Sequence, residues 1–191
     1  MVVREETTAR ARLLKAAGRL FYADGIAATG INAVTEAAGV ARMSLYNNFS
    51  SKDDLVLAYI GARHEEWFEL YRARAGKSAG SKAGVLAVFD AYLDHADLEY
   101  EHGFRGCGLL NAAAELPVGS VGRDAVRRHK EQVEAILADH FQALTTPEQA
   151  AQLAEHCSFL LEGAITRAGL EGQSTRLEHA KSLAATLVGA L

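Results

Sequence analysis

Apolar residues recur three and four positions apart along most of this chain, and this spacing constrains the fold more than any other feature of the sequence. Within residues 7–25 one such stripe consists of Leu13, Leu14, Ala17, Leu20 and Phe21. Only two of the 191 residues are proline, so few positions force a helix to end. The pattern therefore predicts an all-α protein with about nine helices.

Local signals at helix ends place these helices along the chain. Thr146 followed by Pro147 is typical of a helix start, with the threonine as the capping residue and proline in the first turn. Ser50 and Ser51 can each cap the helix that follows, because Asp53 and Asp54 lie three residues further on. The expected helices lie within residues 7–25 and 30–40, and at about 42–48, 52–73, 83–100, 104–116, 121–144, 147–171 and 175–190.

Composition limits the function classes that the chain can serve. The formal net charge is −4, so any contact with nucleic acid must depend on a local basic surface. The sequence has no apolar run long enough to span a membrane and no signal-peptide pattern at its start, so we expect a soluble, cytoplasmic protein. Cys107 and Cys157 lie far apart, which argues against a zinc site and favours buried thiols over a redox pair.

Catalytic patterns are incomplete wherever they begin. The segment "HEEWF" that starts at His64 lacks the second histidine of a zinc-protease helix. "GFRGCGLL" lacks the Lys-Ser/Thr ending of a phosphate-binding loop. His102 and Cys107 are five residues apart, a spacing that does not place them on the same face of a helix. We therefore predict no enzymatic activity, no cofactor and no metal.

Two short predicted helices are joined by a turn at Gly39, an arrangement typical of a helix-turn-helix. In the second of them Arg42 suits the edge of guanine, and Asn47 or Asn48 suits adenine. Tyr46 and Lys52 suit phosphate oxygens. These residues therefore favour a DNA-reading surface, although a solvated polar helix face would have the same composition.

Residues 13–59 resemble the N-terminal DNA-binding domain of the TetR/AcrR family of bacterial transcriptional repressors. The resemblance depends on the first helix with "LF" before Gly25, on "AAGV" at the turn, and on "LYNNF" and "SKDDL" after it. The family usually has a capping Ser or Thr where Gly30 stands, a polar cap at Ala41 and a small residue at Met43. The resemblance implies DNA contacts from Gly30, Ile31, Asn32, Arg42, Met43, Ser44, Tyr46, Asn47, Asn48 and Lys52.

The same resemblance divides the chain into a helix-turn-helix domain over residues 1–51 and a helical regulatory and dimerisation domain over 52–191. The family holds a small-molecule pocket between its middle helices, and "FRGCGLLNAAAELP" resembles a stretch found there. The expected ligand-binding residues are Trp67, Tyr71, Phe89, Tyr92, Phe104, Cys107, Asn111, Glu115, Phe159 and Glu162. Two alternatives stay open: the aromatic residues can form a filled core, and the polar ones can bond to each other or to backbone.

The last two helices carry broad apolar faces with small residues that permit close packing. They can complete the protein's own core, or, as the resemblance implies, pair with their copies in a second subunit. The expected dimer contacts are Cys157, Leu160, Leu161, Ala164, Ala168, Leu183 and Leu187. The predicted function is a homodimeric repressor that a small hydrophobic or aromatic effector releases from a palindromic DNA operator. The alternative is a homodimeric ligand-binding or scaffold protein of this fold without DNA binding.

Overall fold

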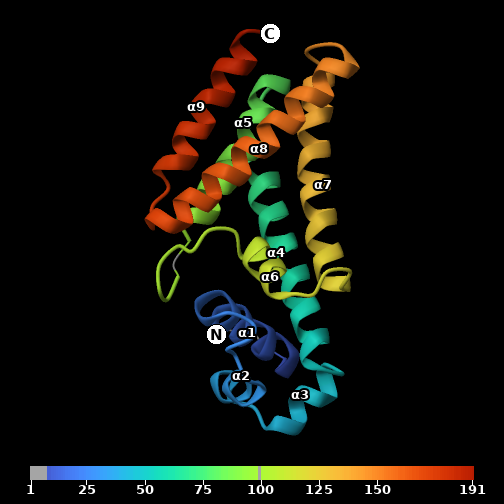
Figure 1. Cartoon of the computed structure of the whole chain (residues 1–191), viewed down its shortest axis with the longest axis vertical. Helices are drawn as coiled ribbons and strands as arrows, with labels where there is room; N and C mark the ends of the chain where they lie inside the picture. Colours follow the sequence, from blue (N-terminus) through green and yellow to red (C-terminus); the bar gives the residue numbers. More distant parts are fainter. Residues whose placement is uncertain (1–7, 99) are drawn as a thin grey trace, which may run out of the picture.

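The computed structural model of the protein describes residues 8–98 and 100–191, and in this part of the chain all regular structure is helical (Figure 1). The helices are α1 (Ala9–Asp24), α2 (Ile31–Ala38), α3 (Arg42–Asn48), α4 (Lys52–Ala75), α5 (Ser81–Ala96), α6 (Gly108–Glu115), α7 (Val121–Gln142), α8 (Pro147–Glu171) and α9 (Thr175–Gly189). The prediction of an all-α fold with about nine helices is confirmed.

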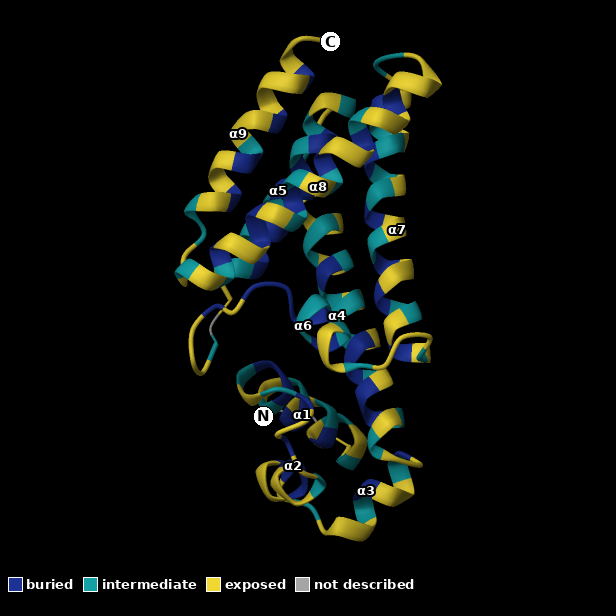
Figure 2. Cartoon of the chain, viewed as in Figure 1, coloured by how far each residue is buried: buried dark blue, intermediate teal, exposed yellow. Residues whose placement is uncertain are grey.

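Helices α1, α2 and α3 form a small bundle at one end of the elongated molecule, and α5 to α9 form a larger bundle (Figure 1). Helix α4 belongs to both, because it begins beside α3 and continues into the larger bundle. Buried side chains line the interior from Leu13 and Leu45 in the small bundle to Leu137 and Ile165 in the large one (Figure 2). A displacement of α4 would therefore change the packing in both bundles.

Helix starts follow the predicted capping signals. The Ser51 hydroxyl accepts a hydrogen bond from the Asp54 amide at 3.0 Å, and the Asp54 carboxylate accepts one from the Ser50 amide at 2.9 Å. Thr146 caps α8, and Pro147 occupies its first turn. These contacts are local in sequence, which is why the sequence predicts them well.

The segment between α5 and α6 differs from the prediction. Helix α5 ends at Ala96 instead of about residue 100, and α6 begins at Gly108 instead of about 104. Gly103 and Gly106 have φ angles of 78° and 82°, which lie in the left-handed region that a right-handed helix does not use. The segment is a loop that packs against α1, as described below.

No helix within residues 8–98 and 100–191 has the length and apolarity that a membrane span requires.

Candidate functional site

Helix α3 is fixed on one face and open on the other. Leu45 is fully buried and holds the helix on the small bundle. Arg42, Met43, Tyr46 and Asn47 are exposed, and the exposed fractions of Met43 and Tyr46 are 68% and 43%. The Arg42 guanidinium lies 6.0 Å from the centre of the Tyr46 ring, one helical turn away. The structure therefore brings these four predicted DNA-contacting side chains together on one solvent-facing surface.

The starts of α2 and α3 carry unusual capping residues. Gly30 and Ala41 are the N-cap residues, and neither has a side-chain oxygen that could accept a bond from the first turn. The first amides of both helices are thus left to an external acceptor, and a phosphate oxygen is a suitable one. Asn32 is exposed and Ile31 is half-buried at the start of α2.

Two of the predicted DNA contacts are held by internal hydrogen bonds. The Asn48 side-chain amide donates to the Ser44 carbonyl at 2.7 Å, which turns Asn48 back onto its own helix. The Lys52 ammonium donates to the Ile26 carbonyl at 2.6 Å and thereby joins α4 to the loop after α1. Lys52 therefore has a structural partner that the sequence did not reveal.

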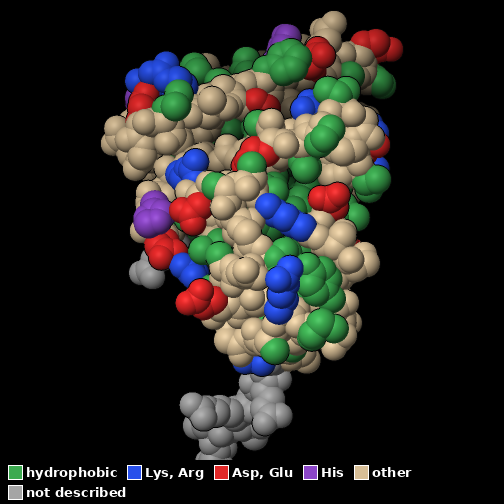
Figure 3. All heavy atoms as spheres, turned by 60° about the horizontal axis from the view of Figure 1, so that its bottom comes forward, with side chains coloured by type: hydrophobic (Ala, Val, Ile, Leu, Met, Phe, Trp, Pro, Cys, Tyr) green, Lys and Arg blue, Asp and Glu red, His purple; other side chains and the backbone are tan. Residues whose placement is uncertain are grey.

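A basic region accompanies α3 although the whole chain is acidic. Figure 3 views the end that carries α2 and α3, and Lys and Arg side chains lie near the centre of this face with hydrophobic groups beside them. The exposed Arg10 of α1 lies 4.8 Å from the centre of the Phe49 ring, and Arg12 donates to the Gly39 carbonyl at 3.4 Å. Neither arginine was among the residues that the sequence predicted to contact DNA.

The loop before α6 forms hydrogen bonds with the end of α1. Tyr22 donates its hydroxyl to the Gly106 carbonyl at 3.1 Å and accepts a bond from the Arg105 amide at 2.7 Å. Burial raises the pKa of Tyr22 to about 12, so this hydroxyl stays protonated at neutral pH. The Arg105 guanidinium donates to the carbonyls of Tyr22 and Ala23. These bonds position the small bundle on the larger one.

Glu115, predicted to bind a ligand, has a different place in the structure. Its carboxylate accepts hydrogen bonds from the amides of Ile26 and Ala27 at 3.0 and 2.7 Å. Asn111, also predicted to bind a ligand, donates its side-chain amide to the Arg105 carbonyl at 3.0 Å. Both residues thus bond to backbone, one of the alternatives that the sequence left open: Glu115 joins α6 to the loop between α1 and α2, and Asn111 stabilises the adjoining loop.

The predicted aromatic pocket is largely a filled core. Trp67, Phe89 and Tyr92 are at most 3% exposed. The ring centre of Trp67 lies 5.7 Å from that of Tyr71 and 5.4 Å from that of Tyr92, distances of direct contact. The other two predicted lining residues of this region, Phe104 and Cys107, are buried as well. Of the two alternatives left open by the sequence, the structure favours the filled core for this set.

A polar cluster is enclosed beside this core. The Lys130 ammonium pairs with the Glu162 carboxylate at 2.7 Å and lies 3.3 Å from the Tyr92 hydroxyl and 3.7 Å from the Cys107 sulfur. Burial, partly opposed by Lys130, raises the pKa of Tyr92 to about 12. Glu162 thus bonds to another side chain of the protein, one of the alternatives that the sequence left open.

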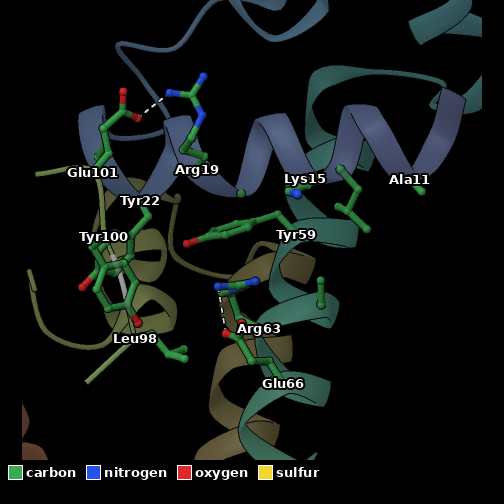
Figure 4. Close-up of a pocket in the computed structure, with 14 residues that line it drawn as sticks. Ala11, Lys15, Arg19, Tyr22, Tyr59, Arg63, Glu66, Leu98, Tyr100 and Glu101 are labelled. Atoms are coloured by element: carbon green, nitrogen blue, oxygen red, sulfur yellow. Dashed lines mark hydrogen bonds and ion pairs between the residues drawn. The ribbon is translucent and has the colours of Figure 1, made fainter. Parts of the chain in front are cut away.

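A cavity lies elsewhere, between α1, α4 and the loop after α5 (Figure 4). Its volume is about 600 Å³, and most of its lining is apolar. Its lining residues include Leu14, Gly18, Tyr22, Tyr59, Arg63, Glu66, Leu98 and Tyr100. The sequence prediction missed this cavity, because its walls come from helices and a loop that are distant in sequence and are brought together by the fold.

The predicted dimer contacts fall into two groups. Cys157, Leu161 and Ala168 are at most 1% exposed and face the protein's own core, so the prediction is corrected for these three. Ala164 is 9% exposed at the edge of the core, and Leu160 is half-buried. Leu183 and Leu187 on α9 are 57% and 38% exposed.

Phe159 also belongs to this outer surface. It was predicted to line the ligand pocket, but it is 64% exposed on α8 and lines a shallow surface depression with Leu160 and Leu183. Helical periodicity identified the apolar faces of α8 but could not decide which of them turns inward, because the helix is apolar on more than one side. We name Phe159, Leu160, Leu183 and Leu187 the α8/α9 surface.

Comparison with known proteins identifies the N-terminal part first. A family model described as "Bacterial regulatory proteins, tetR family" matches residues 13–59. Over 82 residues, 43% of this chain, the sequence is 39% identical to the HTH-type transcriptional regulator TtgR of Pseudomonas putida. Over 92 residues it is 32% identical to the uncharacterized HTH-type transcriptional regulator YerO of Bacillus subtilis. The matches span 39% of the length of TtgR and 32% of that of YerO.

Solved structures extend the similarity to nearly the whole chain. SCO4454, a TetR-family transcriptional regulator from Streptomyces coelicolor, is 32% identical with a TM-score of 0.84, and the match covers 94% of this chain and 95% of that one. A TetR-family regulator from Cytophaga hutchinsonii is 19% identical with a TM-score of 0.82, over 95% of this chain and 94% of that one, which shows the shared fold alone. The family consists of transcriptional regulators and not of enzymes, in agreement with the prediction from the sequence. On the strength of the match to SCO4454 over almost its full length, the chain belongs to the TetR family of bacterial regulatory proteins.

Proposed function

We propose that the protein is a homodimeric repressor that binds a palindromic DNA operator and leaves it when a small hydrophobic or aromatic effector binds. The observation that carries the DNA-binding part is the surface of α3, on which Arg42, Tyr46 and Asn47 face solvent while Leu45 fixes the helix from behind. An arginine and an asparagine on one exposed helix face are the side chains that read guanine and adenine in the major groove. Membership of a family of transcriptional regulators supports the same use of this surface.

Residues 1–51 are proposed as the DNA-binding domain and 52–191 as the regulatory domain. The uncapped amides at the starts of α2 and α3 suit phosphate oxygens on either side of the reading surface. Arg10 and Arg12 add positive charge beside it, so local attraction for DNA outweighs the net charge of −4.

The α8/α9 surface supports the homodimer. Phe159 and Leu183 are large apolar side chains that are more than half exposed, and they line one surface depression between α8 and α9 of the larger bundle. Packing this surface against its copy removes these side chains from water, at about 25 cal/mol per Å². A two-fold dimer presents two α3 helices to a two-fold symmetric site, with half-sites about 34–36 Å apart or a multiple of that distance.

The test is selection of bound fragments from the genome of the source organism by the purified protein. We expect enriched fragments that share one two-fold symmetric motif upstream of genes. Without an enriched motif at physiological salt, the alternative of a ligand-binding or scaffold protein of the same fold would replace this proposal. Transcription from an enriched promoter, measured with and without the protein, then separates a repressor from an activator.

A further inference from the structure

We propose that the cavity between α1, α4 and the loop after α5 is an effector site, and that it takes a small aromatic anion. The inference depends on the proposed function, because it assigns a place and a chemical class to the effector. The place differs from the middle-helix pocket that the family resemblance implies, which in this protein is occupied by Trp67, Phe89 and Tyr92.

The size and lining of the cavity suit a flat apolar body. Its volume of about 600 Å³ lies within the range of about 300–1,000 Å³ that is usual for small-molecule sites. Leu14 of α1 and Ala62 of α4 line it from two sides, and Leu98 lines it from the loop. The ring of Tyr59 lies between the two helices (Figure 4); it is 1% exposed and forms part of the apolar floor of the cavity.

Charge inside the cavity selects for an anion. Arg63 pairs with Glu66 through one terminal nitrogen at 2.8 Å, while its Nε is buried and has no hydrogen-bond partner among the described residues. Arg63 lies beside the ring of Tyr59 and faces the cavity (Figure 4). The Nε is not accessible from the cavity, but the Arg63 side chain is 25% exposed, so its terminal nitrogens are the atoms that a ligand carboxylate or sulfonate can reach with a charge-assisted bond.

The rim of the cavity also carries positively charged side chains. Lys15 lines the rim, is exposed, and forms no ion pair with another residue in the described part of the chain. Arg19 lines it too but already pairs with Glu101. The lining thus holds three cations and two carboxylates, and Lys15 and the terminal nitrogen of Arg63 that does not pair with Glu66 are the groups left for a ligand.

Occupation of this cavity acts directly on the DNA-binding domain. One wall is α1, which packs against α2 and α3, and the other is α4, which continues into the regulatory region. A ligand that fits only when α1 and α4 are further apart binds the shifted arrangement better. By linkage it lowers the affinity for DNA by the factor by which DNA lowers its own affinity.

The experiment uses two fluorescent probes with the same aromatic rings. The anionic probe is 1-anilinonaphthalene-8-sulfonate, and the neutral probe is N-phenyl-1-naphthylamine. For the full-length protein we expect saturable binding with one site per chain, and tighter binding of the anionic probe. Two variants test the location: Ala62→Trp fills the cavity, and Ala73→Trp adds the same ring at an exposed site on α4. Only Ala62→Trp should abolish binding of both probes.

A second pair of variants tests the charge. Arg63→Met combined with Glu66→Gln removes the pair while keeping the net charge. Arg72→Met combined with Glu65→Gln is the matched control, because Arg72 pairs with Glu65 and also lies over an aromatic ring of α4. The first double variant should lower the affinity for the anionic probe at least about tenfold, since a charged hydrogen bond is lost. The affinity for the neutral probe should change less than about threefold. Equal loss of the two probes would overturn the anion assignment. Unchanged probe binding by a folded Ala62→Trp would overturn the site, because the probes then bind elsewhere.

Operator binding is measured on the same samples, so that failure of the inference is distinguishable from failure of the proposed function. Saturating anionic probe should lower operator affinity about 5- to 150-fold in the wild type and have no effect on Ala62→Trp. A protein that binds the operator but ignores the probe refutes the effector site alone. A protein that binds the probe in this cavity but no DNA refutes the repressor alone.

Discussion

The contact between Glu115 and the loop after α1 allows a prediction in depth, because one side chain of α6 holds two backbone amides of the DNA-binding domain. The carboxylate accepts from Ile26 at 3.0 Å and from Ala27 at 2.7 Å. Hydrogen bonds to a charged group are worth about 1.5–3 kcal/mol each when shielded from water. Glu115 is exposed, so hydrogen bonds to water offset part of this stabilisation when the contact is lost. We therefore expect Glu115→Ala to cost about 1–3 kcal/mol of unfolding free energy.

For a chain of this length each kcal/mol lowers the melting temperature by about 2–4 °C. The assay is urea and thermal unfolding followed by circular dichroism, together with hydrogen exchange at the amides of Ile26 and Ala27, which should exchange faster in the variant. The matched control is Glu131→Ala, which removes an exposed carboxylate that pairs with Arg127 one turn away and should cost less than about 0.5 kcal/mol. If Glu115→Ala and the control lose the same stability, and the two amides keep their protection, the contact does not hold the domains together.

Three further predictions concern other parts of the molecule. Lys52→Met should lower the melting temperature through loss of the bond to the Ile26 carbonyl, whereas a pure phosphate contact would leave the melting temperature unchanged and reduce the salt dependence of DNA binding by about one ion. Leu183→Glu and Phe159→Glu should each yield folded monomers in sedimentation. Val118→Glu, at a site that is 89% exposed and outside the α8/α9 surface, should remain dimeric. A monomeric wild type at micromolar concentration would refute the interface. Burial lowers the pKa of His129 to about 3 and that of His95 to about 4, so below about pH 6.5 the unfolded chain binds more protons than the folded one. Each histidine should therefore remove about 2 kcal/mol of unfolding free energy on going from about pH 6.5 to about pH 5. A His129→Gln variant with the same acid sensitivity as the wild type would contradict this.

The fold could be predicted from sequence where its determinants are local. Thr146 with Pro147, and Ser51 with Asp54, act within one helical turn, and the predicted starts of α8 and α4 agree with the structure. The start of α6 could not be predicted in this way. The turn at Gly106 is fixed by Tyr22, 84 residues earlier in the chain, and no local signal reports that contact.

The candidate site shows the same division. The exposed face of α3 follows from the spacing around Leu45 and could be inferred from the sequence. The inward turn of Cys157 and the outward turn of Phe159 depend on how α8 is rotated against α7 and α9, and an apolar helix gives no periodic signal for that choice. The cavity beside Tyr59 is set by the distance between α1 and α4, which is a property of the assembled fold.

The most direct test of the central claim, that the exposed face of α3 reads DNA, is the affinity of Arg42→Ala for a selected operator and for random DNA of the same length at one salt concentration. Arg42 is exposed beside Tyr46 and forms no ion pair with another described residue, so its loss should leave the fold intact. We expect a loss of about 1–3 kcal/mol on the operator and a clearly smaller loss on random DNA. Equal losses on both would show that Arg42 only contacts phosphate, and no loss on either would show that α3 does not enter the groove.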